Sequence, residues 1–202
     1  MNYKLVRLDV WPLRSTKKYP MSSSLNRIAL LRGINVSGRN KIPMTKLRSI
    51  CEGIGWKSVA TCLQTGNIAF SCDEPTAPLE VSLEEAIKSQ FGFSVPVIVI
   101  EGKTFESIIS DSPFPEEAES DPSRVILYLC KNSLRVETQG ELQKRAAEGE
   151  QVRAFSNALW IYFPNGIGRS KLTPAVIDKA SGSPATGRNW KTVLKIKDLV
   201  SG

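Results

Sequence analysis

The sequence contains no histidine. This absence excludes Ser-His-Asp and Cys-His catalytic sites, zinc sites built on histidine, and proton transfer through an imidazole. Any chemistry near neutral pH would have to rely on other acids and bases or on fixed positive charge. Several large classes of enzyme are therefore excluded before any motif is considered.

Cysteine is scarce as well. The four cysteines, Cys51, Cys62, Cys72 and Cys130, form no Cys-x-x-Cys pair. With no such pair and no secretory leader, the simplest interpretation is four reduced thiols in a cytoplasmic protein. Three of them stand in apolar surroundings and are expected to pack as small core residues. Neither a metal site nor a cofactor is predicted.

Long hydrophobic runs are also missing. No apolar stretch approaches the roughly 18 residues of a membrane helix, so no transmembrane segment is predicted. The composition, 41% hydrophobic and 23% charged, is typical of a soluble globular protein. A chain of 202 residues suffices for one ordinary domain or two small ones. The sequence gives no indication of the oligomeric state.

Charge is unevenly distributed around a net value of +7. Residues 25–72 hold seven basic residues and one acid, and residues 164–202 hold seven and two. Residues 73–163, in contrast, hold eight basic residues and sixteen acids. If the two basic segments meet in space, they make a positive face suited to nucleic acid, a nucleotide or phosphate. The alternative is that these charges only solubilise the surface.

Apolar periodicity predicts an α+β protein of two small, associated subdomains. The first subdomain, residues 25–112, reads β-α-β-β-α-β, the split βαβ order of ferredoxin-like folds. Its expected strands are 27–31, 58–63, 67–72 and 95–100, and its main helices are 44–54 and 79–91. We expect antiparallel or mixed sheets with helices on one face.

The second subdomain, residues 113–202, reads β-α-β-β-α-α and echoes the first. Its expected strands are 124–130, 152–155 and 159–163, and its helices are 139–148, 173–180 and 189–200. Residues 112–122 hold three prolines and four acids and are expected to form an exposed connection. Residues 1–24 are expected to be a disordered or mis-annotated leader, with translation starting at Met21.

Four segments share one chemical character: each combines glycine with amide, hydroxyl or basic side chains, and none contains Asp, Glu or Cys. They lie at 32–43, 64–67, 165–174 and 186–190. Glycine lets backbone N–H groups approach a ligand, and a loop that enters a helix points unpaired N–H groups at an anion. Thr173 is a plausible N-cap and Pro174 suits the first helical position. The predicted ligand-binding residues are Arg32, Gly33, Asn35, Asn40, Lys41, Gln64, Gly66, Asn67, Asn165, Gly166, Arg169, Ser170, Lys171, Arg188, Asn189 and Trp190.

Each segment also has a purely structural interpretation, because Asn, Gly and Ser favour turns and caps. Trp190 would stack on a base in one interpretation and anchor the core in the other. Neither glycine pattern matches a Walker loop or a dinucleotide-binding fingerprint. An adjacent Ser170–Lys171 pair on a turn is a poor nucleophile arrangement.

These segments resemble the bacterial domain-of-unknown-function-1697 (DUF1697) family. The matching pieces are "ALLRGINVSGRNKIPM" (29–44), "LQTGNIAFS" (63–71), "FPNGIGRSKLT" (163–173) and "ATGRNWKTVLKI" (185–196). The resemblance covers about residues 25–200 and implies an α+β fold with a ferredoxin-like part. It implies no activity, since none is established for the family.

Three hypotheses about function follow. The first is a protein that binds a phosphate-bearing small molecule or nucleic acid through the four segments. The second is an enzyme that acts on a phosphorylated substrate without histidine or metal, which would need an acid such as Asp178, Glu52 or Asp73 near the cluster. The third is a structural or protein-interaction module whose motifs hold two subdomains together.

Overall fold

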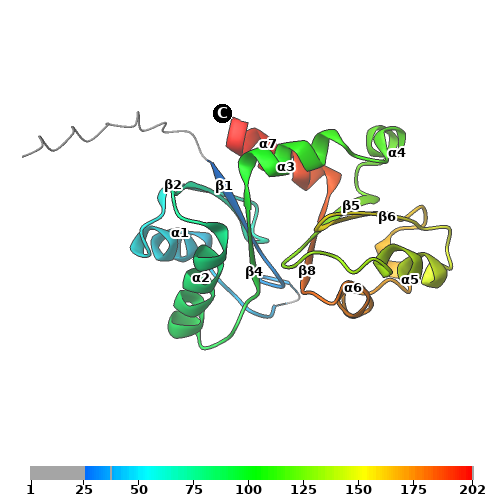
Figure 1. Cartoon of the computed structure of the whole chain (residues 1–202). Coiled ribbons are helices and arrows are strands. Elements are labelled where there is room, and N and C mark those ends of the chain that lie inside the picture. Colours follow the sequence, from blue (N-terminus) through cyan, green and yellow to red (C-terminus); the bar gives the residue numbers. More distant parts are fainter. Residues whose placement is uncertain (1–25, 37, 202) are drawn as a thin grey trace, which may run out of the picture.

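The computed structural model describes residues 26–36 and 38–201. The expected leader, residues 1–24, and the expected start at Met21 lie outside the described residues. Figure 1 shows two halves side by side, with helices α3 and α7 lying across the junction between them.

The first half has the predicted β-α-β-β-α-β order. Its elements are β1 (Arg27–Leu31), α1 (Met44–Gly53), β2 (Lys57–Cys62), β3 (Asn67–Ser71), α2 (Thr76–Phe91), β4 (Val97–Glu101) and α3 (Gly102–Ser110). The four strands form one sheet in the order β2-β3-β1-β4, and every neighbouring pair is antiparallel. The central strand β1 is almost completely buried, which its unbroken apolar sequence predicted.

The second half repeats this arrangement. Its elements are α4 (Pro115–Ser120), β5 (Val125–Cys130), α5 (Thr138–Arg145), β6 (Gln151–Phe155), β7 (Ala158–Tyr162), the 3-10 turn Ile167–Arg169, α6 (Pro174–Ser181), β8 (Ala185–Asn189) and α7 (Trp190–Ser201). The sheet order is β6-β7-β5-β8, again antiparallel throughout. The second half is therefore β-α-β-β-α-β as well.

Two sequence predictions for this half were wrong. The segment 186–190 is not a loop, because Ala185–Asn189 pairs with β5 as the edge strand β8. Residues 112–122 are not simply an exposed connection, because they contain the helix α4 and bury Phe114 and Ala118 in the core. A five-residue strand with one glycine and three polar residues gives no periodic signal, and proline at the first position of a helix is easily read as a break.

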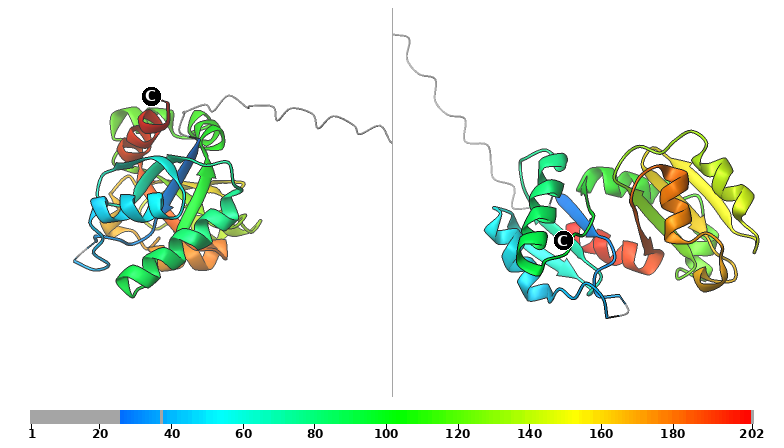
Figure 2. Two further views of the ribbon diagram at one scale, coloured as in Figure 1. Left: turned by 90° about the vertical axis from the view of Figure 1, so that its left-hand side faces the viewer. Right: turned by 90° about the horizontal axis from the view of Figure 1, so that it is seen from below.

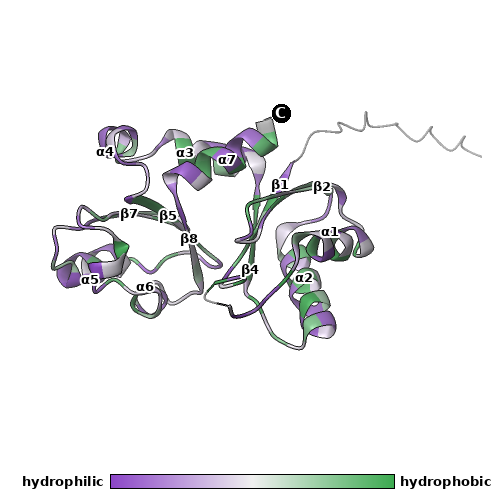
Figure 3. Cartoon of the chain, turned by 180° about the vertical axis from the view of Figure 1, so that it is seen from behind, coloured by the Kyte–Doolittle hydropathy of each residue, from purple (hydrophilic) through white to green (hydrophobic). Residues whose placement is uncertain are grey.

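Alternate residues of the central strands face two different cores. In β1, Ile28 and Leu30 pack into a core shared by both halves, whereas Ala29 and Leu31 pack beneath α1 and α2. The residues of β5 alternate in the same way between the shared core and a third core beneath α5 and α6. Figure 3 shows hydrophobic colours in the strands and hydrophilic colours on the outer surface of α5. Each sheet thus packs one face against the helices of its own half and the other face against the core that both halves share.

Helix α7 joins the two halves. It contacts β2 and β3 of the first sheet as well as β5 and β8 of the second, and α3 packs against it. In the view from below, α7 lies between the halves (Figure 2). Its apolar side chains Val193 and Ile196 are buried in the shared core. The last helix of the chain therefore completes the hydrophobic surface of the first half.

Candidate ligand-binding site

The loop after β1 is ordered by its own amide side chains. Asn35 Nδ2 donates to the carbonyl oxygens of Ile42 (2.9 Å) and Gln64 (2.8 Å), and its Oδ1 accepts from the Ile42 N–H. Asn40 Nδ2 donates to the Gly33 carbonyl at 3.1 Å. The backbone of Asn35 also pairs with Asn40, and a short antiparallel bridge joins Val36 to Arg39. The described residues of this loop, 33–36 and 38–42, are held against the β2–β3 turn by the hydrogen bond from Asn35 to Gln64.

A pocket of about 530 Å³ lies between this loop and the first turn of α1. Its lining residues are Asn35, Gly38, Lys41, Ile42, Pro43, Met44, Thr45 and Gln64. None of them is acidic. Helix α1 begins without a side-chain cap, since its N-cap residue is Pro43, and its first turn holds no acid. The unpaired N–H groups of that turn therefore lie beside the pocket together with Lys41, an arrangement that favours an anion.

The β2–β3 turn contributes Gln64 to the pocket, whereas Gly66 and Asn67 contact other residues of the fold. Gly66 lies against Leu31, and its carbonyl accepts the Leu31 N–H at 2.8 Å. Asn67 is fully buried and donates to the Cys62 carbonyl at 2.8 Å and to Thr65 Oγ1 at 3.1 Å. Asn67 is thus satisfied within the fold.

Arg188 on β8 reaches across to the first half. Its Nε donates to Asn67 Oδ1 at 2.5 Å, and its Nη2 donates to the carbonyls of Leu31 (2.8 Å) and Thr65 (2.9 Å). Its Nη1 donates to Thr186 Oγ1 at 2.8 Å. Burial lowers the pKa of the guanidinium to about 10, which leaves it charged at neutral pH. Arg188 holds the end of β1 and the β2–β3 turn against the second sheet.

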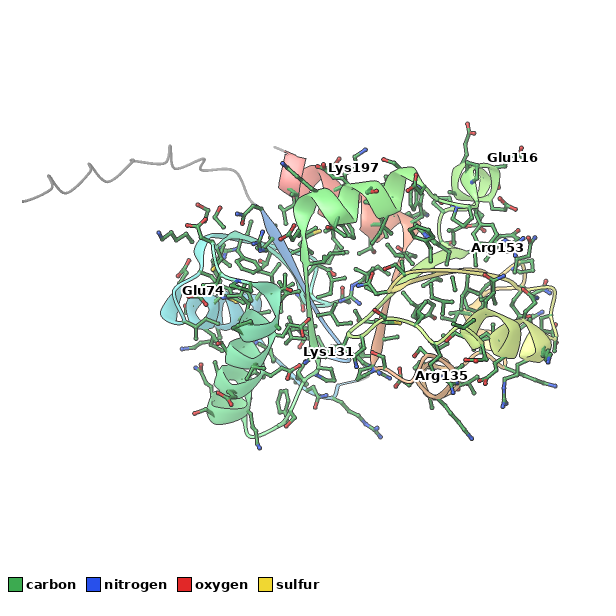
Figure 4. All side chains as sticks on the ribbon, in the orientation of Figure 1. Glu74, Glu116, Lys131, Arg135, Arg153 and Lys197 are labelled. Atoms are coloured by element: carbon green, nitrogen blue, oxygen red, sulfur yellow. The ribbon has the colours of Figure 1, made fainter. Side chains whose placement is uncertain are left out.

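Two further ion pairs join the halves in a reciprocal pattern. Arg32, which follows β1, pairs with Asp178 on α6 at 2.6 Å, and Lys131, which follows β5, pairs with Glu84 on α2 at 2.6 Å. Each carboxylate also accepts a backbone N–H of the adjacent edge strand: Glu84 from Val97, and Asp178 from Ala185. Lys131 lies between the two halves (Figure 4). Asp178, one of the acids considered above, is thus engaged by Arg32 and β8.

Glu80 lies near the Lys131–Glu84 pair, on the same helix α2 as Glu84. It is 8% exposed, accepts the Val99 N–H at 2.8 Å, and has a carboxylate oxygen 3.6 Å from Lys131 Nζ. Burial raises the pKa of this carboxyl above its ordinary value of 4.5. The Glu80 carboxylate therefore takes up a proton at a higher pH in the folded chain than in the unfolded chain.

This shift predicts a pH-dependent effect of Glu80→Gln. Glutamine can still accept the Val99 N–H but carries no charge to bury. The raised pKa of Glu80 stabilises the wild type below the unfolded pKa, and this contribution is lost as pH rises through the folded pKa. We therefore expect urea unfolding to show the variant gaining stability relative to the wild type as pH rises from about 4 to 7. A difference that moves in the opposite direction would show that the Lys131 pair outweighs burial.

The segment 165–174 makes its contacts elsewhere in the second half. Asn165 donates to the Glu148 carbonyl at 3.0 Å, and Ser170 Oγ donates to the Glu150 carboxylate. Arg169 and Lys171 are exposed. Thr173 Oγ1 accepts from the Val176 N–H and Pro174 is the first helical residue, as predicted. No side-chain contact joins this segment to the pocket within the described residues.

The remaining predicted site residues lie at the start of α7. Asn189 Oδ1 accepts from the Thr192 N–H at 3.0 Å and so caps the helix. Trp190 packs against the shared core, with its ring centroid 5.6 Å from that of Trp160. The structure therefore places Trp190 in the core-anchoring position.

All four cysteines are free thiols. Burial raises the pKa of Cys51 to about 12 and that of Cys130 to about 11, which makes both poor nucleophiles. Within residues 26–36 and 38–201, no group of three or more Cys, Asp or Glu side chains is placed to hold a metal ion. Over the same residues, no helix combines the length and apolar character needed to cross a membrane.

The family described as "Protein of unknown function (DUF1697)" matches residues 25–160. The chain belongs to the DUF1697 family. A solved structure, conserved bacterial protein SP0830 from Streptococcus pneumoniae, superposes with a TM-score of 0.68 at 24% identity, covering 88% of this chain and 99% of that one. The likeness shows a shared fold. No curated protein matches this DUF1697 sequence.

Several pocket residues of this DUF1697 protein were absent from the sequence prediction. Ile42, Pro43, Met44 and Thr45 line the pocket, but only their loop neighbours were named. The signal that would have identified them is an uncapped helix start directly after a basic loop. Conversely, Asn67 and Arg188 were predicted to bind ligand, and the structure engages both in contacts between the halves.

Proposed function

We propose that this DUF1697 protein binds a phosphate-bearing small molecule in the pocket beside the first turn of α1. The observation that carries the proposal is the lining of that pocket, which combines Lys41 with an uncapped helix start and contains no acid. A phosphate group would accept hydrogen bonds from the free N–H groups of Met44, Thr45 and Lys46. Cytoplasmic location, consistent with four free thiols, belongs to the same proposal.

The order of the loop supports the proposal. Asn35 fixes both Ile42 and Gln64, so the two sides of the pocket are positioned before any ligand arrives. A preorganised site loses less entropy on binding than a mobile one. The volume of about 530 Å³ lies within the range of small-molecule sites, and a mononucleotide is of suitable size.

The structural hypothesis has support of its own for two of the four segments. Arg188, Asn67 and Gly66 make contacts that join or order the two halves, and these contacts account for the chemistry of segments 64–67 and 186–190. We therefore assign ligand binding to the segment 32–43 with Gln64, and assembly of the halves to residues 65–67 and to the segment 186–190.

Two variants test the proposal by calorimetric titration with AMP, using adenosine as the uncharged comparison. Lys41→Gln removes the cation and should weaken AMP binding about fivefold. Thr45→Glu places a carboxylate on the helix start, and should abolish AMP binding while raising helix stability by about 0.3–1 kcal/mol. Lys197→Gln, an exposed lysine on α7, is the matched control and should change neither quantity (Figure 4).

Unchanged AMP binding in Thr45→Glu would place the ligand elsewhere, and equal binding of AMP and adenosine would remove the phosphate from the proposal. A salt titration decides between ligand classes. A single phosphate gives a shallow dependence of affinity on salt, whereas an oligonucleotide with several phosphate contacts gives a steep one.

A further inference from the structure

A second pocket, of about 270 Å³, lies between the end of α3 in the first half and the β6–β7 hairpin of the second half. Trp160 forms part of its wall and is only 3% exposed, whereas Phe155 at the hairpin is 71% exposed. An aromatic ring left in solvent beside a buried indole offers an apolar surface on which a ligand side chain can pack.

The rim of this pocket carries one cation and one anion that do not neutralise each other. Arg153 and Asp111 both line it, yet neither takes part in a salt bridge within the described part of the chain. Arg153 is nonetheless held in place: Nη1 donates to the Val152 carbonyl at 2.9 Å, and the guanidinium lies 5.9 Å from the Phe114 ring centroid. Figure 4 shows Arg153 on the second half, near α4. Its remaining N–H groups are left for a partner from outside.

We propose that this pocket binds a free α-amino acid with an apolar side chain. Such a zwitterion carries a carboxylate and an ammonium group on one carbon, which matches Arg153 and Asp111 on one rim. The arginine fork binds a carboxylate in two-point fashion, and the aspartate accepts from the ammonium group. The side chain enters the apolar wall formed by Trp160 and Phe155. A volume near the lower limit of small-molecule pockets suits a ligand of this size.

Calorimetric titration of the full-length protein with L-phenylalanine and three analogues tests each part of the match. L-Phenylalaninamide lacks the carboxylate, 3-phenylpropanoate lacks the ammonium group, and glycine lacks the side chain. L-Phenylalanine should bind in the millimolar range, and each analogue should bind at least about fivefold more weakly, because each loses one partly exposed contact.

The variants assign each contact to a residue. Arg153→Gln should remove the preference for phenylalanine over its amide and keep the preference over 3-phenylpropanoate. Asp111→Asn should do the reverse. Arg145→Gln and Asp198→Asn change an exposed arginine and an exposed aspartate that do not line the pocket, and should retain both preferences. Thermal melting checks that every variant is folded.

Three results would overturn the proposal: no phenylalanine binding at concentrations up to about 20 mM, preferences that survive in both pocket variants, or tighter binding of N-acetyl-phenylalaninamide than of phenylalanine. The last result would indicate a polypeptide segment as the occupant. The outcome is independent of AMP binding, because no residue lines both pockets.

Discussion

Replacing Arg188 with alanine is expected to destabilise the protein by about 3–5 kcal/mol, because the change removes a partly buried charge-assisted donor from several acceptors at once. Asn67 Oδ1 and the carbonyls of Leu31 and Thr65 would lose their partner at the junction of the halves. For a chain of this size the melting temperature should fall by on the order of 10 °C. Circular dichroism melting and urea unfolding measure the effect.

Two further variants sharpen this test. Arg188→Lys keeps the charge but loses the planar fork, so it should recover only part of the lost stability. Arg169→Ala removes an exposed arginine of the segment 165–174 and should change stability by less than about 0.5 kcal/mol. If Arg188→Ala melted within a few degrees of the wild type, Arg188 would not be the residue that holds the halves together.

Replacing Gly66 with alanine is expected to cost about 2–5 kcal/mol, for two reasons that add. Gly66 has a φ of +75°, a conformation that L-residues adopt only with strain. A Cβ there would also lie 2.6 Å from Leu31 Cβ and 3.0 Å from Ile34 Cδ1. Because Leu31 Cβ is fixed to the central strand, the clash cannot be relieved by a side-chain rotation, and overpacking adds to the backbone strain.

The control for this prediction is Gly92→Ala, at the C-terminus of α2. Gly92 has a φ of +78°, nearly that of Gly66, but a Cβ added to Gly92 would meet no atom within 4 Å. It should therefore show the backbone cost alone, about 1–2 kcal/mol. Equal unfolding free energies for the two variants would mean that the β2–β3 turn moves away from β1 without cost.

The first sheet was predictable from sequence because its strands carry strong local signals. The segment Arg27–Leu31 is an apolar run and the helix Thr76–Phe91 stops at a glycine in the left-handed conformation. The strand Ala185–Asn189 gave no such signal. Its sequence, ATGRN, has little apolar character, and only its pairing with β5 makes it a strand. Edge strands depend on their neighbours more than on their own propensity.

The candidate site divides in the same way. Its chemistry is visible in sequence, since the segment 32–43 is basic, rich in glycine and amides, and free of acids. The residues that surround the segment in space cannot be read from the sequence. Gln64, for example, reaches the pocket only through the antiparallel pairing of β1 with β3 and the hydrogen bond from Asn35. Arg153 and Asp111 are also far apart in sequence, and they line one pocket only because α3 packs on the core shared with the second half.

By itself, then, the sequence determined membership of the DUF1697 family, the α+β class, the order of the elements in the first half, and the segments whose chemistry suits an anion. These features follow from local propensity, periodicity and composition, which are properties of neighbouring residues. The tertiary structure alone decided which of those segments lines a pocket and which joins the halves. That distinction depends on contacts such as Arg188 with Asn67 and Arg32 with Asp178, between residues more than a hundred positions apart.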